Sequence, residues 1–204
     1  ALNAASRAVT TRGSSLPVLS GLRLELSGDE LLVTGSDLDL TIAVRTVVSG
    51  DGDGVAVVPA KLLSDIVRAL PPGAVTMEID DDEARIGSGR SQFAVRTIVA
   101  HEYPQLPAPA ESSVSLDAAA FAEALRQVVS AASSDESRPI LTGVLMAAEG
   151  DGLRLVATDS YRLAVRDLPG TSVLAEGQQV LVPSTALREL SRLLSSCESV
   201  TLRL

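Results

Sequence analysis

Few residues of this 204-residue chain have the type and spacing that catalysis requires. The single histidine, His101, lies in a stretch rich in proline and alanine between Ala100 and Ala110, with no obvious chemical partner beside it. We expect a solvated loop histidine, and a hydrolase that uses it with Asp159 is only a distant alternative. The sequence holds neither a glycine-rich phosphate loop nor a nucleophile elbow. These observations predict a protein that is not an enzyme.

Acidic residues are the other candidates for chemistry, because closely spaced carboxylates can hold a metal ion. The pairs Asp37 with Asp39 and Asp51 with Asp53, and the run Asp80–Glu83, all fall where the sequence predicts loops and turns. Their spacing fits no EF-hand loop, and acidic turns are ordinary solvent-facing features of hairpins. We therefore expect no metal site and no cofactor.

Composition limits the class of protein further. Hydrophobic residues make up 46% of the chain but aromatic residues only 2%, so aliphatic side chains must build the core. Cys197 is the only cysteine, so an internal disulfide is excluded and we expect a cytoplasmic protein. We expect Cys197 itself to be a small, partly buried side chain. No apolar run approaches the roughly 18 residues that cross a bilayer, so no membrane partner is expected. A net charge of −9 argues against a protein that binds nucleic acid over its whole surface, yet allows a local basic face.

The chain repeats itself at a nearly constant distance. The stretch Val156–Arg166 is typical of two short strands that meet at a polar corner, and Val33–Arg45 is a looser copy of it. The corner residue Thr158 corresponds to Ser36, 122 residues earlier (158 − 36). The other matched blocks are Leu16–Leu24 with Arg138–Met146, Val58–Leu70 with Val182–Leu194, and Ala74–Ile79 with Ser199–Leu204. Chance similarity between apolar strands would not keep this order. We therefore predict an α+β protein with two copies of one domain, residues 1–110 and 111–204, both truncated.

Periodicity and punctuation place the elements of each copy. Helices are predicted at residues 1–11, 59–70, 117–132 and 184–195, and strands at 22–26, 31–34, 41–48, 75–79, 84–87 and 92–98. Residues 49–54 are predicted as a plain loop, and residues 100–110 as a linker. The apolar stripe of the second helix, which we expect to face the core, is Leu62, Leu63, Ile66, Val67 and Leu70.

Basic residues gather on the helices. Arg188 and Arg192 project together, four residues apart, and Lys61 and Arg68 do so on the matched helix. The first helix offers Arg7 and Arg12, and the third offers Arg126. Because acidic residues concentrate in the turns, these helices could form a mildly basic face. Charge alone leaves an ordinary solvated surface equally open.

Several motifs resemble those of the bacterial sliding clamp, the beta subunit of the replicative DNA polymerase III. They are Leu16–Gly21 with its echo Arg138–Gly143, Val58–Lys61, Ser88–Ser91, Glu102–Leu106 and, most specifically, Ala157–Val165. The resemblance implies the DNA clamp fold, with helices on one face of antiparallel sheets and three similar domains in each subunit. Two subunits of that family close into a ring, a homodimer. The third domain is absent here, so we expect that this piece alone does not close the ring.

The resemblance implies that duplex DNA is a partner, held topologically and independently of its sequence. Such a ring needs no tight phosphate contacts, which reconciles a DNA partner with a net charge of −9. The residues expected to face DNA are Arg7, Arg12, Lys61, Arg68, Arg126, Arg138, Arg188 and Arg192. Of these, Arg12 lies one residue away from the register of the family.

The resemblance also implies that short peptides recruit the replicative polymerase, the clamp loader and other proteins. The near wall of the peptide pocket would comprise Leu141, Thr158, Ser160, Tyr161, Arg162 and Leu163, and the other wall would lie beyond Leu204. Many relatives carry Gly-His where this chain has Ser160-Tyr161. Ring closure would use Phe93, Val95 and Thr97 on the strand Arg90–Ile98. A duplicated β-rich interaction scaffold without DNA binding is the alternative function.

Overall fold

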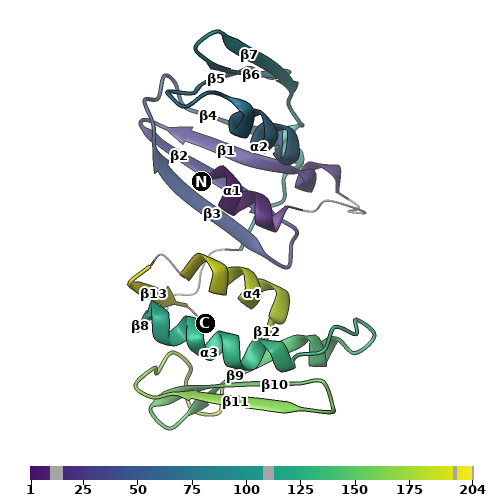
Figure 1. Ribbon diagram of the computed structural model, residues 1–204, viewed down its shortest axis with the longest axis vertical. Coiled ribbons are helices and arrows are strands. Elements are labelled where there is room, and N and C mark those ends of the chain that lie inside the picture. The colour runs from purple at the N-terminus through teal and green to yellow at the C-terminus, as the bar shows by residue number, and fades with distance from the viewer. Residues whose placement is uncertain (10–15, 108–112, 195–196, 204) are drawn as a thin grey trace. The chain divides into compact units, whose positions relative to one another are not determined.

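The computed structural model describes residues 1–9, 16–107, 113–194 and 197–203 (Figure 1). It divides the chain into two compact units, unit 1 at Ala1–Leu106 and unit 2 at Pro107–Leu204. Each unit is an α+β domain with its own hydrophobic core.

Unit 1 contains two antiparallel sheets with helices against the larger one. Its elements are α1 (Leu2–Ala5), η1 (Ser6–Ala8), η2 (Pro17–Ser20), β1 (Gly21–Ser27), β2 (Glu30–Ser36), β3 (Thr41–Val47), β4 (Gly54–Pro59), α2 (Ala60–Ala69), β5 (Thr76–Ile79), β6 (Glu83–Ser88), β7 (Ser91–Arg96) and η3 (Ala100–Glu102). The four-stranded sheet has the order β3-β2-β1-β4, and the three-stranded sheet has the order β5-β6-β7. Both α1 and α2 contact the four-stranded sheet.

Unit 2 repeats this plan. Its elements are β8 (Val114–Asp117), α3 (Ala118–Val128), η4 (Val129–Ala131), η5 (Pro139–Thr142), β9 (Gly143–Glu149), β10 (Gly152–Thr158), β11 (Leu163–Leu168), β12 (Gln179–Pro183), α4 (Ser184–Leu193) and β13 (Ser199–Leu202). The four-stranded sheet has the order β11-β10-β9-β12, and β13 pairs with β8. Figure 1 shows α3 and α4 on one face of the four-stranded sheet, as the sequence predicts for helices and sheets of this fold.

The pairing registers confirm that the two units are copies. In unit 1, β1 pairs with β4 so that Gly21 opposes Pro59, and in unit 2 β9 pairs with β12 so that Gly143 opposes Pro183. Residues that match in the sequence repeat therefore also occupy matching positions in the two sheets. Duplication was predicted from matched sequence blocks and their nearly constant spacing, and the strand pairing bears it out.

The core of unit 2 forms between α3 and the sheet. Phe121 and Leu125 of α3 are fully buried in one cluster with Leu153 and Leu155 of β10. The helix begins as predicted, because the Asp117 carboxylate accepts a hydrogen bond from the backbone N–H of Ala120 at 2.7 Å. Each large apolar side chain that is buried in this way stabilises the fold by about 1.5–3 kcal/mol.

The predicted core face of α2 was wrong at one position. Leu63 is fully buried, but Leu62 is 53% exposed. One residue of a helix rotates the side chain by about 100°, so both leucines cannot face the same sheet. The neighbouring buried position is instead Ser64, whose hydroxyl lies 3.0 Å from the hydroxyl of Ser6.

Three further segments and Cys197 differ from the sequence prediction. β4 and β12 were not predicted, because each strand runs without a break into the helix that follows it. Residues 100–106, within the stretch predicted as a linker, pack onto unit 1, where Tyr103 is only 8% exposed. Cys197 was expected to be partly buried and is exposed, just beyond α4.

The acidic turns have a structural role that the sequence did not reveal. Asp53 accepts a hydrogen bond from the backbone N–H of Gly28 at 2.7 Å, and Asp29 accepts one from Gly50 at 3.0 Å. The loop 48–53 is therefore tied to the β1–β2 turn in both directions. Among the described residues, no group of three or more acidic, cysteine or histidine side chains could hold a metal ion.

Candidate functional site

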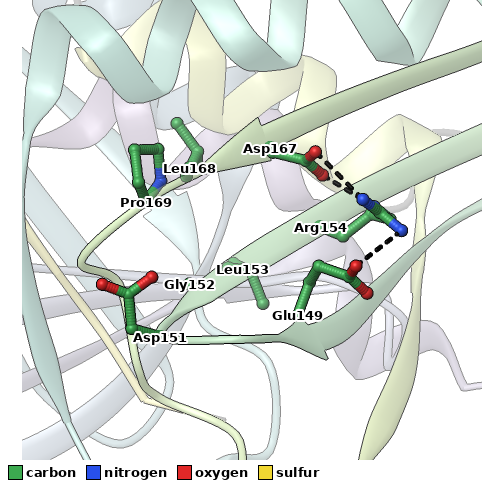
Figure 2. Close-up of a pocket in the computed structure, with 8 residues that line it drawn as sticks. All are labelled: Glu149, Asp151, Gly152, Leu153, Arg154, Asp167, Leu168 and Pro169. Carbon is green, nitrogen blue, oxygen red and sulfur yellow. Dashed lines mark hydrogen bonds and ion pairs between the residues drawn. The ribbon is translucent and has the colours of Figure 1, made fainter.

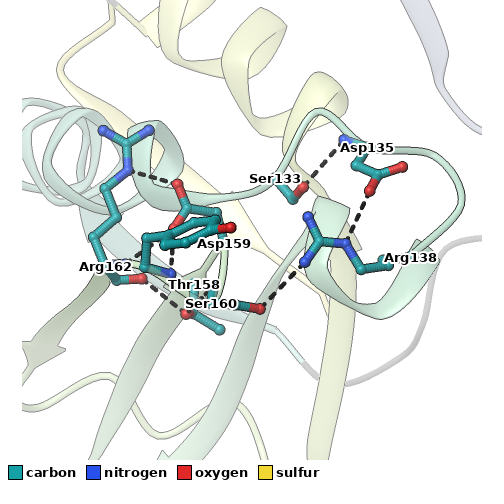
Figure 3. Close-up of polar contacts among 8 residues, drawn as sticks. Ser133, Asp135, Arg138, Thr158, Asp159, Ser160 and Arg162 are labelled. Carbon is teal, nitrogen blue, oxygen red and sulfur yellow. Dashed lines mark hydrogen bonds and ion pairs between the residues drawn. The ribbon is translucent and has the colours of Figure 1, made fainter.

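The strands β10 and β11 meet at a tight polar corner, residues 158–163 (Figure 3). Thr158 opposes Leu163 as the last pair of the hairpin, and the loop between them is closed by the backbone N–H of Asp159 and the carbonyl of Arg162 at 3.4 Å. The Thr158 hydroxyl accepts from the N–H of Ser160 and donates to the Arg162 carbonyl. The Thr158 side chain thus connects the two sides of the turn.

Asp159 is the centre of this hydrogen-bond network. One carboxylate oxygen accepts from the backbone N–H groups of Tyr161 and Arg162, each at 3.0 Å, and the other accepts from the Arg162 guanidinium at 2.9 Å. The N–H of Tyr161 and then that of Arg162 hold the pKa of Asp159 below its ordinary value, and the Arg162 side chain adds to this. Asp159 is therefore an ionised structural anchor and is not free to act as a catalytic base.

The corresponding corner of unit 1 has the same backbone plan. Asp37 accepts from the N–H groups of Asp39 and Leu40, and its own N–H donates to the Leu40 carbonyl. The Ser36 hydroxyl accepts from the N–H of Leu38, as Thr158 does in unit 2. Both corners serve the fold. Only the second carries an exposed aromatic side chain, Tyr161, and a cation, Arg162.

Exposed apolar side chains lie at and beside the corner of unit 2. Tyr161 is 95% exposed and Leu163 is 65% exposed, whereas Leu141 is half-buried. Arg138, the residue before η5, donates hydrogen bonds to Asp135 at 2.9 Å and to the Ser160 hydroxyl at 3.4 Å (Figure 3). Its side chain therefore links the start of η5 to the corner. Apolar area beside fixed cations suits a short peptide, whose apolar side chains and backbone carbonyls need both.

Three of the cations predicted to face DNA are exposed but already paired within their own helix. Arg68 pairs with Asp65 at 3.2 Å, Arg126 pairs with Glu123 at 2.5 Å, and Arg192 pairs with Glu189. Hydrogen bonds from Arg126 hold the pKa of Glu123 below its ordinary value, so this pair stays ionised. These carboxylates partly neutralise the three cations, which the spacing of the cations alone did not indicate.

The remaining predicted DNA contacts differ in character. Lys61 and Arg188 are exposed and, among the described residues, form no ion pair. Arg7 is exposed on η1, and Arg138 is tied to Asp135. Arg12 lies outside the described residues. Lys61 and Arg188 are therefore the cations most available to a phosphate backbone.

The predicted ring-closing strand is β7, which forms one edge of its three-stranded sheet. Phe93 is 42% exposed there, whereas Val95 is 7% exposed and belongs to the core of unit 1. Thr97 is tied to the turn before β6, because its hydroxyl donates to the Asp81 carbonyl at 2.6 Å. Of the three predicted residues, only Phe93 offers apolar area at this edge.

A shallow pocket of about 240 Å³ lies at the other end of the same sheet in unit 2 (Figure 2). Arg154 reaches both acidic walls, at 2.7 Å from Asp167 and 3.1 Å from Glu149. Hydrogen bonds from Arg154 hold the pKa of Asp167 below its ordinary value. Arg154, Asp167 and Glu149 therefore form a surface ion-pair network, whereas Asp151, the third carboxylate of the pocket, forms no ion pair among the described residues. The hydrolase alternative gains no support, because the Asp159 carboxylate is already held by the backbone N–H groups of Tyr161 and Arg162 and by the Arg162 side chain.

Two copies of one α+β unit, each with helices packed against a four-stranded antiparallel sheet, define a duplicated clamp-type fold. The chain belongs to the family of the DNA polymerase III beta subunit: residues 1–107 match the N-terminal domain of that subunit, and residues 115–204 match its central domain. No described helix is both long enough and apolar enough to span a membrane.

Similar proteins agree with this assignment. The beta sliding clamp of Streptomyces coelicolor is 35% identical over 92% of this chain and 50% of its own length, and that of Synechococcus elongatus is 38% identical over 95% and 53%. The crystal structure of the DNA polymerase III subunit beta from Pseudomonas aeruginosa superposes with a TM-score of 0.91 at 30% identity, over 100% of this chain and 56% of that one. The chain thus spans about half the length of these relatives.

Proposed function

We propose that this chain carries two domains, residues 1–110 and 111–204, of a DNA sliding clamp that acts in the cytoplasm. The match of both halves, in order, to the N-terminal and central domains of the DNA polymerase III beta subunit carries this proposal. The role is tethering and not catalysis. In the complete protein, two subunits close a ring around duplex DNA and keep the replicative polymerase on its template.

The charges of the helices support a loose hold on DNA. Exposed Lys61 and Arg188 can meet phosphates, while the ion pairs of Arg68, Arg126 and Arg192 weaken the attraction of the remaining cations. A protein that neutralises few phosphates binds weakly and without sequence preference. A ring retains DNA by its topology, so weak contacts are compatible with sliding.

Partners dock at the corner of unit 2. Tyr161 and Leu163 supply exposed apolar area, and Arg162 and Arg138 supply hydrogen-bond donors for peptide carbonyls or carboxylates. We infer that the replicative polymerase, the clamp loader and other proteins bind here through short peptides. Two solved relatives, from Pseudomonas aeruginosa and Bartonella birtlesii, are described as bound to griselimycin, and we propose the same corner for that compound.

Ring closure in the complete protein uses the edge of β7. An edge strand presents unpaired backbone groups that can pair with another chain, and Phe93 adds apolar area beside them. The second subunit supplies the complementary strand from its third domain.

Retention on DNA of different topology tests the function. The complete gene product, loaded by its clamp loader onto nicked circular DNA, is separated from free protein by gel filtration before and after linearisation of the DNA. A ring stays on the circle and slides off the linear ends. Equal retention on both forms would overturn the proposal and favour direct binding, and no retention on either would favour the DNA-free interaction scaffold.

A further inference from the structure

Arg138 connects two segments of the proposed docking surface that are far apart in the sequence (Figure 3). Its Nε donates to the Asp135 carboxylate at 2.9 Å, and its Nη1 donates to the Ser160 hydroxyl at 3.4 Å, 22 residues along the chain. Its backbone carbonyl accepts from the N–H of Leu141 at 3.0 Å. The segment that carries the apolar Leu141 is therefore tied to the corner that carries Ser160. We call this connection through Asp135, Arg138 and Ser160 the brace.

Asp135 holds one end of the brace in place. Its carboxylate accepts from the Ser137 hydroxyl at 2.6 Å and from the N–H of Ser137 at 3.1 Å. These hydrogen bonds, together with the Arg138 guanidinium, hold the pKa of Asp135 below its ordinary value. The acceptor is thus charged and fixed by its own loop, and the forked donors of a guanidinium can serve it and a second acceptor at once.

Unit 1 has no counterpart of the brace. The repeat matches Arg138 with Leu16 (138 − 16 = 122) and Ser160 with Leu38 (160 − 38 = 122). A leucine side chain neither donates nor accepts a hydrogen bond. The corner of unit 1 nevertheless has the same backbone, with a φ of 79° at both Leu38 and Ser160 and the same pair of hydrogen bonds to the preceding aspartate. The turn therefore forms without the brace, so the brace has a role other than folding the turn.

We propose that Ser160 is a positioning residue for partner docking in unit 2, which acts through Arg138. The brace uses Nε and Nη1 of Arg138, and Nη2 has no hydrogen-bond partner among the described residues. Its donors are therefore held in one orientation and remain available to a carbonyl or carboxylate of a peptide. The inference rests on the docking corner of the proposed function and deepens it, because it names the residue that arranges the corner.

The brace also fixes the two apolar parts of the corner relative to each other. Leu141 lies on the segment that Arg138 ties down, whereas Tyr161 and Leu163 follow Ser160 directly. A surface whose parts are already held in place loses less conformational entropy when a ligand binds. Loss of the Ser160 hydroxyl should therefore weaken docking even though this hydroxyl is occupied by Arg138 and not by the ligand.

Calorimetric titration of the complete gene product with griselimycin, which we assign to this corner, tests the inference. Ser160→Ala removes the hydroxyl but keeps the Cβ that restricts the backbone of the turn. Arg138→Lys keeps the charge but loses the forked donors that reach two acceptors. We expect each variant to bind roughly three- to tenfold more weakly than the parent, with an unfolding midpoint close to that of the parent. Ser160→Asn keeps an acceptor and suits a positive φ, so it should bind within about twofold of the parent.

The double variant, Arg138→Lys with Ser160→Ala, separates positioning from direct contact. If Ser160 acts through Arg138, the double variant binds no more weakly than Arg138→Lys alone. Losses that multiply would mean that Ser160 contacts the ligand by itself, and they would overturn the inference. Ser20→Ala removes an exposed hydroxyl of unit 1 and is the matched control, whose affinity should equal that of the parent.

Hydrogen exchange on the same proteins tests the brace without a ligand. In Ser160→Ala the segment around Arg138 loses its tie to the corner, so the backbone N–H groups of Arg138 and Leu141 should exchange several-fold faster than in the parent. Unchanged exchange at both groups, or equal affinity of Ser160→Ala and a parent that binds, would overturn this inference alone. A parent that bound no griselimycin would overturn the docking corner of the proposed function and the role of Ser160 with it.

Discussion

Leu38 and Ser160 occupy the same position in two hairpin corners and adopt the same left-handed backbone conformation, each with a φ of 79°. They follow Asp37 and Asp159, whose carboxylates accept equivalent pairs of backbone hydrogen bonds. A leucine is among the residues least suited to this conformation, and it is retained because the surrounding hydrogen bonds fix the turn. The geometry of the corner is thus a property of the repeat, while the docking side chains belong to unit 2.

Replacing Leu38 by glycine should stabilise unit 1. The left-handed conformation costs a residue with a side chain roughly 1–2 kcal/mol, and replacing Leu38 by glycine removes this cost. The greater freedom of glycine in the unfolded state offsets about 0.5–1 kcal/mol of the stabilisation. Leu38 is 58% exposed, so little packing is lost. We expect Leu38→Gly to raise the free energy of unfolding by roughly 0.5–1 kcal/mol in urea titrations.

The matched control is Val47→Gly, at an 85% exposed position of strand β3. Glycine loses more backbone freedom on folding than valine and is depleted in strands, so this variant should lower the free energy of unfolding by up to about 1 kcal/mol. If Leu38→Gly also lowered it, the left-handed conformation would not be a source of strain.

Asp159 should make the corner sensitive to acid. Its folded pKa lies below the ordinary value, so ionised Asp159 stabilises the fold above its unfolded pKa of about 3.9 and this contribution disappears as the pH falls through the folded pKa. Asp159→Asn removes the charge but keeps an acceptor. We expect the variant to be less stable than the parent at neutral pH, with the difference shrinking as the pH falls below about 4.

Thermal unfolding of both proteins across this pH range measures the difference. Asp151→Asn removes one charge from another turn of unit 2 and serves as the control for net charge. If the difference in unfolding midpoint between Asp159→Asn and the parent were the same at all pH values, the stabilisation by the hydrogen bonds to Asp159 would not depend on its charge.

Much of the fold was predictable because the sequence contains it twice. The corner, the amphipathic helices and the β1–β2 and β9–β10 hairpins follow from local patterns, and the repeat placed them in equivalent positions. The docking residues Tyr161 and Arg162 were identified from the motif that contains them. Their exposure and hydrogen bonds agree with a docking role, which remains a proposal.

The features that were not predictable depend on long-range contacts. The apolar pattern of α2 does not distinguish Leu62 from Leu63, because the choice depends on where α1 lies. Tyr103 sits among prolines that indicate a linker, yet it is buried by residues more than forty positions away. The ion pairs that neutralise the helix cations depend on rotamers, which spacing alone does not determine.

The exposure difference between Leu62 and Phe121 should be visible in stability. Phe121 is 0% exposed in the core of unit 2, so Phe121→Ala should cost about 3–5 kcal/mol through lost burial and a residual cavity. Leu62→Ala should change the free energy of unfolding by less than about 1 kcal/mol. Urea denaturation followed by circular dichroism measures both, and equal costs would contradict the orientation of α2.

Arg188 should contribute to weak DNA binding. It is exposed and lacks an ion pair among the described residues, so its loss removes one available phosphate contact. We expect Arg188→Ala to reduce affinity for a 30-base-pair duplex at low salt and to lower the slope of log affinity against log salt by about one. Arg85→Ala is the matched control, because it removes the same charge from β6, where Arg85 pairs with Asp80 and Glu83. Equal effects of the two variants would indicate bulk charge and not a specific face.

Tyr161 should be required for docking and dispensable for folding. Its side chain is 95% exposed, so Tyr161→Ala removes ligand contacts with little effect on the unfolding midpoint. Truncation of an aromatic contact residue commonly costs binding about 2 kcal/mol or more, which corresponds to roughly a thirtyfold loss of affinity. Calorimetric titration with griselimycin measures this loss. Leu38→Ala, in the equivalent corner of unit 1, is the control and should leave the affinity unchanged, because only unit 2 combines the apolar side chains with Arg162. An unchanged affinity of Tyr161→Ala would place griselimycin away from the corner.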